Sequence, residues 1–149
     1  MKKSIITDMI SALLVFLFVY AAASKLLNYE QFSAQLSQSP LLSHYSHVVA
    51  VAIPLIEFGI VILLINSTTK LLGLIASFTL LILFTSYLIA VLSFSAHIPC
   101  SCGGILQGMS WKTHIAFNLI FIGFTIVGIV LLRSEIKRGQ IIAYNALVT

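Results

Sequence analysis

Four long apolar runs, separated by short polar segments, dominate the chain. They extend from about residue 5 to 27, 46 to 65, 71 to 94 and 111 to 132. A helix needs roughly 20 residues to cross a hydrocarbon core about 30 Å thick, and each run reaches that length. The pattern predicts an all-α, four-helix transmembrane bundle. We expect residues 1–149 to form a single integral membrane domain without internal repeats.

Composition supports a membrane protein rather than a soluble one. Hydrophobic residues make up 60% of the chain and charged residues 8%, and the mean hydropathy is +1.11. Soluble domains usually carry about 25% charged residues. The formal net charge is +4, but the basic residues neither cluster nor alternate with aromatic ones. We therefore expect contact with membrane lipid and no nucleic-acid partner.

The first apolar run also has features of a secretory signal. Lys2 and Lys3 precede it, and it ends in the small residues "AAAS" at positions 21–24. However, the run is longer than the apolar core of a typical signal peptide. We therefore interpret it as a membrane span that stays in the protein.

Lysine and arginine are distributed unevenly over the two ends of the predicted spans. Cytoplasmic loops are enriched in these residues, so both termini are predicted to be cytoplasmic, in a bacterial plasma (inner) membrane. The segment between the third and fourth spans, which holds both cysteines, then faces an oxidising compartment. The six predicted cytoplasmic residues are Lys2, Lys3, Lys70, Arg133, Lys137 and Arg138, and the two predicted outer residues are Lys25 and Lys112.

The connector between the first two spans predicts a further short helix. Tyr29, Phe32 and Leu36 follow the i, i+3, i+7 spacing of an amphipathic helix lying along a membrane interface. Ser39 and Pro40 then have the character of an N-cap and a first helical position. They predict that the second transmembrane helix begins near Pro40.

The third span carries small and hydroxyl-bearing residues at regular intervals. Thr79, Ser86 and Ser93 are seven residues apart and share one helix face, and Gly73 with Ser77 forms a small-xxx-small step. Such residues allow helices to approach closely and to bond across the contact. We predict that this face packs against a neighbouring helix.

Glu57 is a carboxylate deep within the second apolar run. An ionised acid near the membrane midplane costs about 2.5 to 3.5 kcal/mol, so Glu57 should be protonated or partnered. Pro54, one turn earlier, cannot donate to the carbonyl of Ala50 and should loosen the helix there. Glu57 either bonds a hydroxyl on another helix, or forms a pocket wall or proton site with Lys25 as a partner.

Two polar residues share a face of the fourth span. His114 and Asn118 are four residues apart, and His114 lies about one turn from the start of that span. A histidine there is either a packing and hydrogen-bonding residue, or a group that favours a nearby cysteine thiolate and shuttles protons.

The cysteines stand in the motif "CSCGG". Cys100 and Cys102 are either inert thiols, a static disulfide or an exchanging pair. A disulfide across one residue closes a small, strained ring, and strained disulfides are more oxidising. Gly103 and Gly104 leave room for a partner chain, so the motif favours exchange. No metal site is expected, because C-x-C lacks the spacing of structural zinc pairs.

Several stretches together resemble the MauE-like proteins of the DoxX superfamily. They are "YAAASKLLNYEQF", "IPLIEFG" and "PCSCGG" followed by "SW", "H" and "FN". The resemblance implies that Cys100 and Cys102 are a redox pair serving an extracytoplasmic thioredoxin-like partner. The architecture is also similar to the quinone-linked thiol oxidases DsbB and vitamin K epoxide reductase, which implies a membrane quinone as a possible cofactor. Those enzymes, however, use C-x-x-C and usually a second cysteine pair.

Two functions follow as expectations. The first is a membrane thiol:disulfide oxidoreductase or electron-transfer accessory protein. The alternative is a non-enzymatic accessory or scaffold subunit of a larger membrane complex, and a transporter has less support. The residues expected to carry the chemistry are Cys100, Cys102 and His114, and those expected to line a cofactor site are Glu57, Lys25 and Asn118.

Overall fold

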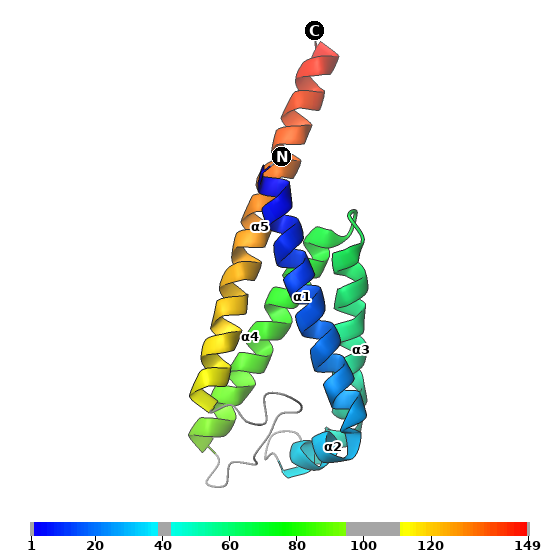
Figure 1. The fold of residues 1–149 in the computed structure, drawn as a ribbon, viewed down its shortest axis with the longest axis vertical. Coiled ribbons are helices and arrows are strands. Elements are labelled where there is room, and N and C mark those ends of the chain that lie inside the picture. The colour runs from blue at the N-terminus through cyan, green and yellow to red at the C-terminus, as the bar shows by residue number, and fades with distance from the viewer. Residues whose placement is uncertain (1, 39–42, 95–110, 149) are drawn as a thin grey trace.

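The computed structural model describes residues 2–38, 43–94 and 111–148, and all of its regular elements are helical (Figure 1). This confirms the predicted all-α class. In chain order the helices are α1 (Lys2–Leu27), α2 (Tyr29–Gln38), the 3-10 turn η1 (Ser43–Tyr45), α3 (Ser46–Ile65), α4 (Lys70–Phe94) and α5 (Trp111–Val148).

Four of these helices are long and apolar enough to cross a membrane, as the sequence predicts. Their apolar stretches are Ile5–Leu27, Ser43–Ile65, Lys70–Ala90 and Thr113–Tyr144. The protein is therefore a multi-pass membrane protein.

Helix α5 is longer than the predicted fourth span. Its 38 residues rise about 57 Å at 1.5 Å per residue, well beyond a bilayer core. The sequence predicts a span ending near Leu132 and a basic membrane anchor after it, but the helix continues without a break to Val148. Nothing in that tail breaks a helix, since it has no proline and its single glycine is Gly139. Figure 1 shows the tail projecting beyond the other helices.

The four long helices form a bundle in which α1 packs against α3 and α5, and α4 packs against the same two helices. The start of α1 and the tail of α5 lie at one end of the bundle. Helix α2, the end of α4 and the start of α5 lie at the other, which we call the α2 end (Figure 1). Which end faces the cytoplasm stays a prediction.

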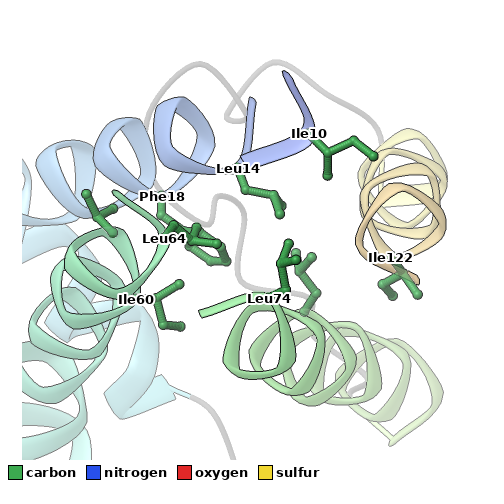
Figure 2. Packing of buried hydrophobic residues seen from close by; sticks show 9 residues of the cluster. Ile10, Leu14, Phe18, Ile60, Leu64, Leu74 and Ile122 are labelled. Atoms are coloured by element: carbon green, nitrogen blue, oxygen red, sulfur yellow. The ribbon is translucent and has the colours of Figure 1, made fainter. Parts of the chain in front are cut away.

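The apolar core lies along the middle of the bundle, where all four helices contribute (Figure 2). Leu14 of α1, Leu64 of α3 and Leu74 of α4 are almost completely buried. Many large apolar side chains, such as Phe16 and Leu55, are instead exposed on the outside. In a membrane protein that outer surface faces lipid tails, which are as apolar as the side chains themselves.

Close packing of α3 and α4 depends on a small residue. A Cβ added to Gly73 would lie 2.9 Å from the backbone nitrogen of Leu64, closer than such atoms approach. Ser77, one turn later, is fully buried, and its hydroxyl donates to the carbonyl of Gly73 over 2.8 Å. The small-xxx-small step is therefore confirmed as a helix contact.

The predicted packing of the α4 hydroxyl face is wrong. Thr79, Ser86 and Ser93 are all exposed, whereas Leu74 and Leu81 on the opposite side enter the core. The buried face of α4 carries leucines together with two other hydroxyl residues, Ser77 and Thr85, so a regular row of hydroxyls does not by itself mark the face that packs. Thr79 also satisfies its own hydroxyl, which donates to Ile75 in the same helix over 3.0 Å.

Helix α2 is amphipathic, as its spacing predicts. Phe32 and Leu36 are buried against Ala50 of α3, with Tyr29 packed beside them. The α-helical part of the second span begins at Ser46, later than the predicted start near Pro40. Ser39 and Pro40 themselves lie outside the described residues, so their capping role stays a prediction.

Candidate functional site

A buried ion pair joins α1 to α3. The Lys25 Nζ and Glu57 Oε1 atoms are 2.7 Å apart, and the two side chains are only 11% and 7% exposed. Of the two alternatives for Glu57, this contact supports the one with Lys25 as partner, rather than a hydroxyl on another helix. The pair is nearly neutral as a whole, which lowers the cost of holding a carboxylate among apolar helices.

Lys25 reaches Glu57 because its side chain points into the bundle. In a helix, side chains lean toward the N-terminus, which for the last turn of α1 means away from the α2 end. Nζ accordingly also lies 3.3 Å from the carbonyl oxygen of Ala21, one turn back, and donates to it. The ring of Phe32 in α2 lies 6.0 Å from the same ammonium group, at cation–π distance.

Glu57 follows the buried Pro54 by three residues in α3. Proline has no backbone N–H, so the carbonyl of Ala50 lacks its usual helical donor. Only one oxygen of the Glu57 carboxylate is used. Oε2 is buried and has no hydrogen-bond partner among the described residues.

His114 and Asn118 face the interior from α5. Both are buried, at 5% and 4% exposure. Phe84 of α4 flanks the His114 ring, with 5.7 Å between ring centroids. The Asn118 amide nitrogen is buried and, in the described part of the chain, has no acceptor.

Two pairs of polar residues, Lys25 with Glu57 and His114 with Asn118, therefore point into the bundle, and we call the four residues together the polar cluster. Three of the four membrane helices supply it, and α4 borders it through Phe84. Among the described residues, Glu57 Oε2 is an acceptor without a donor and Asn118 Nδ2 is a donor without an acceptor. Chemically, it suits a neutral polar group that both donates and accepts hydrogen bonds. Among the described residues no group of His, Cys, Asp and Glu could hold a metal ion.

Cys100 and Cys102 lie outside the described residues, so their pairing stays a prediction. The helices on either side of residues 95–110 are nevertheless informative. Helix α4 ends at Phe94 and α5 begins at Trp111, both at the α2 end of the bundle (Figure 1). His114 is three residues into α5, so it is the member of the polar cluster nearest in sequence to the cysteines.

Sequence reasoning missed several of these contacts. The position of Phe32 beside Lys25 follows from the fold of α2 onto α3 and has no local sequence signal. A second ion pair, Lys70 Nζ to Asp8 Oδ1 at 2.7 Å, joins α4 to α1 at the other end. Asp8 near the start of the first span was a visible signal for it, because an acid in an apolar run needs a partner.

Comparison with known proteins identifies one family. No curated protein and no solved structure matches the chain. The family described as methylamine utilisation protein MauE matches residues 3–131, which include all four predicted membrane spans except the final residue of the fourth. The chain therefore belongs to the MauE family.

Proposed function

We propose that this protein is a membrane thiol:disulfide oxidoreductase or electron-transfer accessory protein that acts on an extracytoplasmic thioredoxin-like partner. The observation that carries the proposal is the polar cluster. Two of its members, His114 and Asn118, are buried near the start of α5, the helix that follows the cysteine segment in the sequence. A buried ion pair with unused hydrogen-bonding atoms is unusual in a protein that needs only to pack its helices. The family description, which refers to methylamine utilisation, supports an accessory role.

The proposed chemistry transfers two electrons from the partner to Cys100 and Cys102. A partner thiolate attacks one sulfur of the Cys100–Cys102 disulfide, and the other cysteine leaves as a thiolate. The second partner thiolate then attacks the resulting mixed disulfide. The products are an oxidised partner and a reduced Cys100/Cys102 pair. A membrane quinone is the proposed final acceptor, which supplies a sink for two electrons and two protons.

His114 is proposed to assist this exchange as a proton acceptor. It lies within one helical turn of the start of α5, and its ring is buried beside Phe84. A neutral imidazole there can take the proton of the nearer cysteine and so favour the thiolate, which is the reactive form.

The proposed location is a bacterial plasma membrane with both termini in the cytoplasm. Support comes from the six basic residues on the side of the termini. The α2 end, where α4 ends before the cysteine segment and α5 begins after it, would then face the extracytoplasmic side. That side is where a disulfide can persist and where a thioredoxin-like partner would meet it.

The test is to trap the intermediate. We would express Cys100→Ser and Cys102→Ser separately in the native host and examine non-reducing gels for an adduct that dithiothreitol dissolves. In Cys100→Ser, the Cys102 thiolate can attack the oxidised partner and form a mixed disulfide, and this chain then has no second thiol to attack that bond, so only the partner's own second thiol can resolve it. We expect the adduct mainly in Cys100→Ser, with the partner held on Cys102. The variant lacking both cysteines is the matched control and should form none.

A non-enzymatic accessory subunit is the second candidate. The exposed hydroxyl face of α4, with Thr79, Ser86 and Ser93, favours it, because such residues suit a contact with another membrane helix. In this alternative, a static Cys100–Cys102 disulfide would only hold its own segment in place. The two serine variants would then behave alike, form no specific adduct and leave the phenotype unchanged.

A further inference from the structure

Four buried side-chain atoms lack a hydrogen-bond partner among the described residues, and two of them, on Glu57 and Asn118, indicate a ligand site; the other two are the Ser11 and Ser24 hydroxyl oxygens. Glu57 Oε2 is a buried acceptor without a donor, and Asn118 Nδ2 is a buried donor without an acceptor, among the described residues. Each such atom costs about 1–3 kcal/mol when it stays unpaired. The parent residues as a whole are 5% and 4% exposed, so bulk water does not reach them freely.

The two atoms belong to a set of four polar residues, Lys25 of α1, Glu57 of α3, and His114 and Asn118 of α5, and α1 packs against both α3 and α5. Glu57 is tied to Lys25 by the 2.7 Å ion pair. His114 and Asn118 are one helical turn apart on the same face of α5. Aromatic rings border the set, with Phe84 beside His114 and Phe32 beside Lys25.

We propose that Glu57 and Asn118 bind the headgroup of a lipid-soluble quinone and its hydroquinone. The inference rests on the proposed function, because it names the residues that would hold its electron acceptor. The Asn118 amide would donate to a quinone carbonyl, and the Glu57 carboxylate would accept from a hydroquinone hydroxyl. A ligand that reaches the interior of a bundle from the bilayer must be lipid soluble. The quinone and its hydroquinone meet this requirement, and together they both accept and donate hydrogen bonds.

The redox step balances with the groups named. Oxidation of the Cys100/Cys102 dithiol to a disulfide releases two electrons and two protons. Reduction of a quinone to a hydroquinone consumes the same number of each. Lys25 keeps Glu57 Oε1 engaged, so the carboxylate presents Oε2 in one orientation.

Binding can be measured without thiol chemistry. We would purify the full chain in detergent with both cysteines replaced by serine and titrate it with a short-chain benzoquinone, then with the corresponding hydroquinone. The single tryptophan, Trp111, lies three residues before His114, and its quenching by the quinone provides a signal. Equilibrium dialysis would measure both ligands independently of fluorescence.

Asn118→Leu and Thr125→Val form a matched pair of variants. Thr125 is buried two turns further along the same face of α5, but its hydroxyl already donates to Phe121 over 2.7 Å. We expect Asn118→Leu to weaken quinone binding about tenfold, as loss of one buried hydrogen bond implies, and Thr125→Val to leave it unchanged. Glu57→Gln should weaken hydroquinone binding more than quinone binding, because only the hydroquinone donates.

Two results would overturn the inference. One is the absence of saturable quinone binding to the cysteine-free protein. The other is equal affinity in Asn118→Leu and Thr125→Val, which would mean that internal water satisfies the two atoms. Circular dichroism would verify folding, and Asn118→Ala replaces Asn118→Leu if leucine does not fit. The adduct experiment is separate, so a failure of quinone binding is distinguishable from a failure of thiol exchange.

Discussion

Replacing Lys25 by methionine should destabilise the bundle strongly. Methionine keeps an apolar stem of similar length but leaves the Glu57 carboxylate without its cation. The two side chains are 11% and 7% exposed, so water can compensate little. Breaking a buried pair by removing one partner costs about 3–5 kcal/mol, and a lone charge near the midplane costs about 2.5–3.5 kcal/mol. We expect the free energy of unfolding to fall by about 3 kcal/mol in Lys25→Met.

A double-mutant cycle tests this reasoning. The combined Lys25→Met and Glu57→Gln variant buries no charge, and we expect its stability to lie within about 1 kcal/mol of wild type. Unfolding by denaturant in detergent micelles, followed by circular dichroism, measures all four proteins. Lys70→Met is the matched control: its ion pair has the same 2.7 Å length, but Asp8 is 58% exposed, so the loss should stay below about 1 kcal/mol. Additive effects of the two substitutions, or a Lys25→Met protein as stable as wild type, would refute a strong buried pair.

Three further predictions concern other parts of the chain. Gly73→Ala should destabilise the bundle by about 1–3 kcal/mol, because the added Cβ would lie 2.9 Å from the α3 backbone. Gly59→Ala is the control and should leave stability unchanged, because nothing lies within 4 Å of its added Cβ. Unfolding measurements on both variants test this prediction. A membrane-impermeant thiol reagent should label Cys100 or Cys102 on reduced, intact cells, and labelling only after lysis would contradict the predicted topology. His114→Ala should shift the pH dependence of thiol alkylation, and an unchanged profile would remove His114 from the mechanism.

The membrane helices could be predicted because a bilayer imposes one requirement on every span. Apolar runs of about 20 residues are visible without any knowledge of contacts, so α1, α3 and α4 begin and end within a few residues of their predicted bounds. The helical tail of α5 could not be predicted in this way. The charged residues Arg133, Glu135, Lys137 and Arg138 follow Leu132, so the sequence predicts that the span ends there, but hydropathy says nothing about whether the residues beyond it stay helical.

Side-chain placement was only partly predictable. The sequence predicted that Glu57 needs a partner and offered Lys25 as a candidate. It did not show that the Lys25 side chain points into the bundle, because that direction depends on where the last turn of α1 lies. The α4 hydroxyls illustrate the reverse. Thr79 and Ser86 have a regular spacing, yet a regular spacing exists on every face of a helix, and the buried face of α4 also carries hydroxyls, on Ser77 and Thr85. The roles of Cys100 and Cys102 stay predictions, because both residues lie outside the described part of the chain.

The inward orientation of Lys25 has a consequence for how the protein enters the membrane. Glu57 follows Lys25 by 32 residues, so α1 is synthesised before its counter-charge exists. At a synthesis rate of about 5–20 residues per second, Glu57 is added roughly two to six seconds after Lys25. Until then its ammonium must stay in the headgroup region, which holds the end of α1 near the surface. We therefore expect the first helix to reach its final depth only after Glu57 of α3 has inserted and paired with Lys25.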